Sequence, residues 1–117
     1  MSRRVQRLNT LFREELSELI RSQLRDPRLP EIVSITRVET AADLQHATVH
    51  VSVLGDDEAK ARTIETLSGA AALLRRRLSD RVPIRRTPAL HFVLDESIEQ
   101  AAHILEIMKR VSEEKEP

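Results

Sequence analysis

The sequence contains no cysteine, tryptophan or tyrosine, and only two glycines and two phenylalanines in 117 residues. Without cysteine, a disulfide framework and thiolate chemistry are excluded. Two glycines are too few for a glycine-rich phosphate loop or a dinucleotide-binding fingerprint. No apolar run approaches the ~20 residues that span a bilayer, and no signal-peptide pattern follows the basic N-terminus. We therefore expect a cytoplasmic, non-membrane protein that is not an enzyme and binds no cofactor.

The four histidines do not form a metal-ligand pattern. His46 and His50 lie in a segment with strand alternation, where four residues span about 13 Å, so they cannot bind one ion. His50 could pair with His91 across strands, but only in a register that the sequence does not fix. Since there is no cysteine and no helical histidine pair, we predict no metal site. Residues 56–58 are acidic and are interpreted as a helix cap.

Positive charge is concentrated locally, although the chain has a formal net charge of zero. Between residues 75 and 86, six arginines are interrupted by a single carboxylate, Asp80. These arginines are Arg75, Arg76, Arg77, Arg81, Arg85 and Arg86. A second basic group, at the N-terminus, consists of Arg3, Arg4 and Arg7. Local fields of this kind suit the phosphate backbone of a nucleic acid.

Two other interpretations of the arginines stay open: solvated charge on helix surfaces, or a protein-interaction module that docks an acidic protein partner. If the ligand is RNA, the scarcity of aromatic rings predicts how it is recognised. Proteins that read single-stranded RNA usually stack bases on exposed rings. Phe12 and Phe92 both fit core patterns, so we expect RNA to be recognised through its backbone and shape.

Apolar spacing and turn signals predict elements in the order α-β-β-α-β-α. The expected helices cover about residues 2–25 and 57–79, with a last one beginning near residue 97, and the expected strands cover about 32–40, 45–54 and 90–94. This order indicates a small α+β domain, with helices packed on one face of a three-stranded sheet whose first two strands are antiparallel. We expect a single domain over residues 1–111 and a charged, frayed tail over 112–117.

The second expected helix contains a stretch with almost no side chains, formed by Gly69, Ala70, Ala71 and Ala72. Glycine inside a helix costs about 1 kcal/mol relative to alanine. The stretch therefore marks either a close approach of the helix to the sheet or a kink.

Short motifs in a fixed order cover most of the chain. They are Arg4-Val5, Asp26-Pro27-Arg28, Val38-Glu39, Asp43-Leu44 with Ala47, Val51 to Asp56, Leu74-Arg75-Arg76, Pro88 to Phe92 and Asp95 to Ile98. Taken together, their order and spacing resemble the ribosome-binding factor A family, from Arg4 to about Val111.

The resemblance implies a KH-like domain of the second type that binds the free 30S ribosomal subunit and its 16S rRNA. It implies a late maturation factor that is not an enzyme, assists 5′-end processing of 16S rRNA and growth in the cold, and is released with the help of maturation GTPases. The family's kink motif, alanine–any residue–glycine, aligns with Ala70, Ala71 and Ala72, so alanine replaces the glycine and the kink should be displaced or shallower. We expect a monomer whose arginines contact phosphate.

Overall fold

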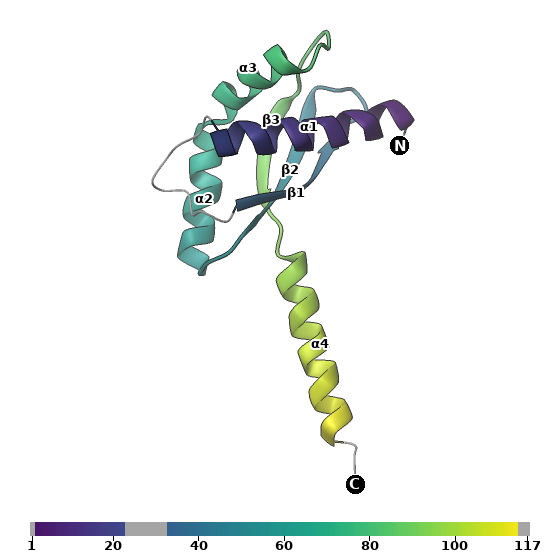
Figure 1. Cartoon of the computed structure of the whole chain (residues 1–117), viewed down its shortest axis with the longest axis vertical. Helices are drawn as coiled ribbons and strands as arrows, with labels where there is room; N and C mark the ends of the chain where they lie inside the picture. Colours follow the sequence, from purple (N-terminus) through teal and green to yellow (C-terminus); the bar gives the residue numbers. More distant parts are fainter. Residues whose placement is uncertain (1, 23–32, 115–117) are drawn as a thin grey trace.

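The computed structural model describes residues 2–22 and 33–114 of the chain. Its elements are α1 (Arg3–Ser22), β1 (Val33–Thr40), β2 (His46–Val53), α2 (Asp57–Gly69), α3 (Ala71–Arg81), β3 (Ala89–Leu94) and α4 (Ser97–Glu114). Figure 1 shows α1, α2 and α3 gathered around the sheet, while α4 projects away from it. The expected end of the first helix, at residues 23–25, and the stop signal after it lie outside the described residues.

The sheet has the strand order β1-β2-β3. β1 and β2 are antiparallel, as predicted, whereas β2 and β3 are parallel. A parallel neighbour requires a crossover connection, which α2 and α3 provide. Because side chains alternate between the two faces of a strand, Ala47, Val49, Val51 and Val53 of β2 all point into the core and are buried.

The core forms between this face of the sheet and the apolar stripe of α1. Leu8, Phe12, Leu16 and Leu19 recur at three- and four-residue spacing and are all buried. They belong to one cluster with side chains from the sheet and from α2 and α3. The predicted helix stripe therefore fixes where α1 lies, and its arginines are left on the exposed side.

The helix predicted over residues 57–79 is divided into α2 and α3 at Ala70, inside the small-residue stretch. Ala70 has φ −94° and ψ 1°, and its N–H is shared between the carbonyl oxygens of Thr66 and Leu67. A methyl group built on Gly69 would meet no atom within 4 Å. Gly69 itself therefore makes no close approach to the sheet, whereas Ala70 and Ala71 of the same stretch pack against the core where the helix divides.

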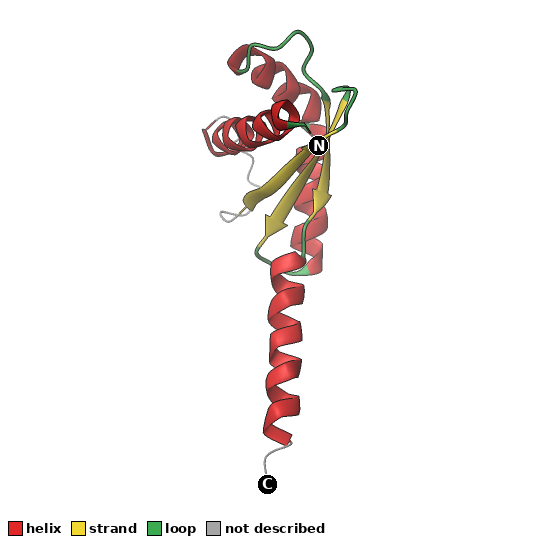
Figure 2. Ribbon diagram, turned by 90° about the vertical axis from the view of Figure 1, so that its right-hand side faces the viewer, coloured by secondary structure: helices red, strands yellow, loops and turns green. Residues whose placement is uncertain are grey.

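The last helix does not pack on the sheet. The expectation that the helices cover one face of the sheet therefore holds only for α1, α2 and α3. α4 has no buried residue, and Ile98, Leu105 and Met108 are 65%, 65% and 61% exposed. Figure 2 shows it extending beyond the ends of the strands. α4 also continues to Glu114, into the segment expected as a frayed tail, while residues 115–117 lie outside the described part.

Polar contacts at its first turn hold α4 in this direction. A bulge in β1 near Thr36 lets that side chain donate a hydrogen bond to Asp95 Oδ2. Asp95 Oδ1 accepts the N–H of Ser97 at 2.9 Å. The side chain of Lys60, 7% exposed, forms ion pairs with Glu96 and Glu99. The direction of α4 is thus set where it leaves β3.

We predict that Asp95→Asn lowers stability in a pH-dependent way. The hydrogen bond from Thr36, with that from Ser97, lowers the pKa of Asp95 from 3.8 to about 2. A carboxyl with a depressed folded pKa stabilises the fold above its unfolded pKa, and this contribution is lost as pH falls through the folded value. Urea unfolding should show the variant less stable at pH 7, with the difference shrinking between about pH 4 and pH 2. A difference that stays constant with pH would contradict this assignment, and Thr36→Val should weaken the same pH dependence.

Candidate nucleic-acid interface

The direction in which each arginine of α3 points is set by its angular position around the helix axis. Leu74 and Leu78 are buried, and residues advance by about 100° each. Arg76 therefore points away from the core, with Arg75 and Arg77 on either side of it. All three are exposed. Arg75 and Arg77 flank opposite sides of α3, so the three guanidinium groups point in different directions.

Arg75 faces the connection between α3 and β3 and fixes it. Its Nε donates a hydrogen bond to the carbonyl oxygen of Thr87 at 2.9 Å. Val82 and Thr87 at the ends of the connection are buried, and the N–H of Ile84 bonds to the Val82 carbonyl oxygen at 2.9 Å. The intervening Arg85 and Arg86 are exposed. They are thus carried on a short loop that is fixed at both ends.

The first concavity, here called the α3 hollow, lies between α3 and this loop and has a volume of about 360 Å³. It is lined by Ala72, Arg75, Arg76, Ser79, Ile84, Arg85 and Thr87. Three guanidinium groups line it and no carboxylate does. Because a guanidinium offers a planar set of donors suited to phosphate oxygens, the lining favours an anion.

A second concavity, the turn hollow, joins the N-terminal arginine group to the loop. It has a volume of about 640 Å³ and is lined by Arg4, Leu8, Asp43, Leu44, Gln45, Ile84, Arg85 and Arg86. The N-terminus of α1 and the α3–β3 loop lie at the same end of the molecule, opposite α4 (Figures 1 and 2). Arg4, Arg75, Arg76, Arg85 and Arg86 therefore form one surface, here called the arginine surface.

The other two N-terminal arginines extend this surface along α1. Arg4 and Arg7 line one shallow depression with Leu8 and Leu11. Arg3 and Arg7 line the next. The sequence pattern predicted all these arginines as binding residues. It did not predict the other residues that line the turn hollow, since no local pattern shows that the β1–β2 turn, α1 and the α3–β3 loop meet.

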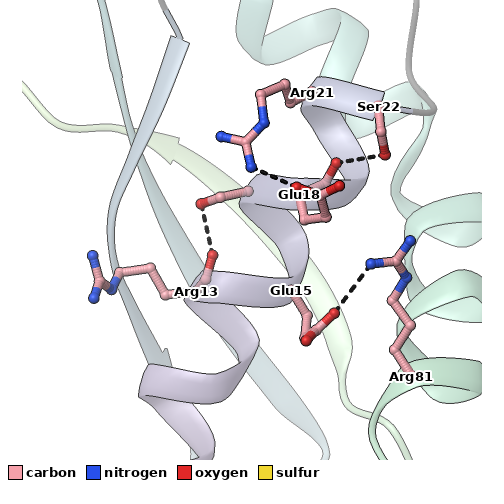
Figure 3. Close-up of polar contacts among 7 residues, drawn as sticks. Arg13, Glu15, Glu18, Arg21, Ser22 and Arg81 are labelled. Atoms are coloured by element: carbon pink, nitrogen blue, oxygen red, sulfur yellow. Dashed lines mark hydrogen bonds and ion pairs between the residues drawn. The ribbon is translucent and has the colours of Figure 1, made fainter.

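Arg81, which is also in the predicted set, points toward α1. Figure 3 shows its guanidinium reaching Glu15, and Nη1 lies 3.2 Å from Oε2. Glu18 is nearby, and its hydrogen bond from Arg21 holds its pKa below the usual range, with a smaller contribution from Arg81. Arg77 lies one helical turn before Arg81 on the same side of α3. Neither Arg77 nor Arg81 lines the two hollows.

The histidine pair in the structure differs from the His50–His91 pair considered from the sequence. The register of β2 and β3 places Thr48, not His50, opposite His91. His46 Nδ1 instead lies 2.9 Å from His91 Nε2, and His50 lies 3.4 Å from Glu39. Within residues 2–22 and 33–114, no group of three or more histidines and carboxylates is placed to hold a metal ion.

Sequence comparison identifies the family of the chain. The family model described as ribosome-binding factor A matches residues 4–108. The chain belongs to the ribosome-binding factor A family. Its relative in Acetivibrio thermocellus is 42% identical over 109 residues, which cover 93% of this chain and 89% of the relative. The Clostridium novyi relative is 42% identical over 112 residues, covering 96% and 93%. The resemblance noted in the sequence motifs is therefore confirmed.

Solved structures of the family share this fold. The crystal structure of ribosome-binding factor A from Thermus thermophilus superimposes with a TM-score of 0.68 and 29% identity, covering 77% of this chain and 94% of that one. A model of the Thermus protein fitted into an electron cryo-microscopy map of its 30S complex gives 0.63 and 28%, covering 75% and 91%. The predicted α+β, KH-like fold class is confirmed. Among the described residues, no helix is long and apolar enough to cross a membrane.

We predict that Arg75 and Arg76 contribute differently to stability. Arg75→Met would leave the carbonyl of the buried Thr87 without its partner, which should lower the free energy of unfolding by about 1 kcal/mol. Arg76→Met, on the exposed side of α3, should change it by less than about 0.5 kcal/mol. Urea unfolding at pH 7 measures both, and equal effects would show that the Arg75–Thr87 bond does not fix the loop.

Proposed function

We propose that this protein is a non-enzymatic assembly factor that binds the free 30S ribosomal subunit, with 16S rRNA as its direct ligand. Family membership supports the class of function, and the Thermus relative is described in a 30S complex. The observation that carries the proposal is the arginine surface. It gathers guanidinium groups from α1, α3 and the α3–β3 loop, and only Asp43 adds a carboxylate to the two hollows.

The binding mechanism follows from the charge and rigidity of this surface. Guanidinium groups bind phosphate oxygens through paired donors. Arg85 and Arg86 are held by a fixed loop, so less conformational entropy is lost when they bind. Arg3 and Arg7 extend the contact along α1. Arg77 lies at the edge of the arginine surface, whereas Arg81 contacts phosphate only when its ion pair with Glu15 is broken.

The proposal includes the finer role that the family resemblance suggests. The protein acts in the cytoplasm, as a monomer, on free subunits late in their maturation. It assists 5′-end processing of 16S rRNA, including during cold adaptation, and leaves the subunit with the help of maturation GTPases. It uses neither a metal nor a cofactor, and the domain over residues 1–111 carries the binding surface.

The same arginines suit an acidic protein partner, which is the alternative to RNA. The two ligands are distinguished by whether ribonuclease destroys the association. Tagged protein mixed with purified small subunits should lose them after ribonuclease treatment if rRNA is the ligand. Retention of a subunit protein after complete digestion of the rRNA would instead support the protein-docking alternative.

We predict that Arg76→Glu/Arg85→Glu weakens binding to purified small subunits by at least about tenfold at moderate salt, because two phosphate contacts become repulsive. The slope of log K against log salt should become shallower by about two, since each phosphate contact contributes about 0.9. Filter binding at several salt concentrations measures both quantities.

The matched control is Arg62→Glu/Arg110→Glu, which makes the same charge change on α2 and α4. Both side chains are exposed and lie outside the two hollows. The control should retain most of the affinity, and both variants should change the free energy of unfolding by less than about 1 kcal/mol, which in the control includes the loss of the exposed Arg110–Glu106 ion pair. Undiminished binding by the Arg76/Arg85 variant would refute the assignment of this surface.

A further inference from the structure

The turn hollow has a composition that phosphate contact alone does not explain. Three guanidinium groups, from Arg4, Arg85 and Arg86, share its lining with one carboxylate, Asp43. One oxygen of that carboxylate accepts the N–H of Gln45 at 3.0 Å. The hollow therefore carries an excess of positive charge that favours an anionic ligand.

Apart from the polar Gln45, the remaining wall of the turn hollow is aliphatic. Leu8 is 9% exposed, and Leu44 and Ile84 are half-buried. The α3 hollow differs, because Ile84 is its only large apolar residue. A phosphate group would cover the arginines of the turn hollow but leave this aliphatic wall in water. A ligand that satisfies both parts has an anionic group and a part that packs on aliphatic side chains.

The backbone of the β1–β2 turn holds the wall in place. Leu44 has φ +62°, a left-handed conformation that is uncommon for residues other than glycine. Its N–H bonds to the Ala41 carbonyl oxygen at 2.8 Å, and the Gln45 carbonyl oxygen accepts the N–H of Ala89 at 2.9 Å. Leu44 packs partly against the core. The side chain is thus held at the hollow before any ligand arrives, by a conformation that most residues avoid.

We propose that the turn hollow binds one unpaired RNA nucleotide, with its base against Leu8, Leu44 and Ile84 and its phosphates on the surrounding arginines. The volume of about 640 Å³ lies within the range of small-molecule sites. Arginine planes stack on bases as aromatic rings do, so a chain with few rings retains a way to hold a base. Asp43 lies where its free oxygen accepts a hydrogen bond from an amino group on the base edge.

This inference rests on the proposed function, since it assumes an RNA ligand, and it adds a preference that the arginine surface alone does not give. A surface that reads only phosphates binds a continuous duplex and a duplex with one unpaired nucleotide about equally. A surface that includes this hollow favours the RNA with the unpaired nucleotide.

The test uses the full-length protein and two RNA hairpins that differ only in one unpaired nucleotide within the stem. The unchanged protein should bind the bulged hairpin about tenfold more tightly, which is near the low end of the effect of one base stacked on an aromatic ring, because this wall is aliphatic. Leu44→Asn should abolish the preference without weakening binding to the paired hairpin. Asparagine tolerates the left-handed conformation, so the turn should be kept.

Two controls keep the result interpretable. Leu54→Asn makes the same substitution at an exposed loop position outside the hollow and should keep the preference. Leu44→Gly removes the wall with a residue that adopts this φ freely, and it should give the same result as Leu44→Asn. Unfolding curves identify any variant that has lost its fold, and the other variant then decides.

Each outcome separates this inference from the function on which it rests. Equal affinity of the unchanged protein for both hairpins, or a preference that survives both Leu44 variants, would overturn the nucleotide site and leave the phosphate-binding surface intact. Failure of the proposed function would show instead as small-subunit binding that Arg76→Glu/Arg85→Glu does not weaken. Competition by free nucleoside monophosphate and by inorganic phosphate completes the test, and stronger competition by phosphate would also overturn the site.

Discussion

Mutual repulsion among the arginines is the constraint that the rest of the structure must satisfy. The arginine surface holds five like charges at one end of a small domain, and the residues lining its two hollows supply one carboxylate. Such groups stay together only if their backbones are fixed by other interactions. The core beneath α1 fixes Arg4, and the buried Val82 and Thr87 fix the loop. The favourable free energy of core packing thus opposes the repulsion between these positive charges, which an anionic ligand can neutralise.

Local sequence patterns predicted the elements because each element follows from a local period. The alternation from Ala47 to Val53 identifies β2 and its buried face, and the short turn before it makes β1 an antiparallel neighbour. The parallel pairing of β3 is different, since it depends on how a connection crosses the sheet, whereas the small-residue stretch at 69–72 did mark a possible break in the second helix. Amphipathic spacing in α4 also predicted a helix correctly. Amphipathic spacing shows that a helix has an apolar face, but it does not show that other parts of the same chain bury that face.

The candidate site was predicted in its residue type but not in its arrangement. A run of arginines is visible in the sequence, yet helical phase and tertiary contacts separate its members. Arg76 points away from the core, whereas Arg81 meets Glu15, 66 residues earlier in the chain. Arg4 joins Arg85 only because α1 and the loop share one end of the domain. Long-range contacts of this kind leave no periodic signal, so counting charges overestimates how many of them lie on one surface.

The distribution of charge also sets how the protein can lie on RNA. Residues 96–117 hold six carboxylates and three basic residues, and α4, which contains most of them, projects from the end opposite the arginine surface (Figure 1). Under the proposed function, the phosphates of an approaching RNA attract the arginine surface and repel the acidic helix, which orients the molecule before contact. The contacts of Lys60 and Asp95 at the base of α4 keep the acidic helix pointing away. A net charge of zero therefore conceals a polarised molecule, and under the proposed function this polarity favours one orientation on the ribosomal subunit.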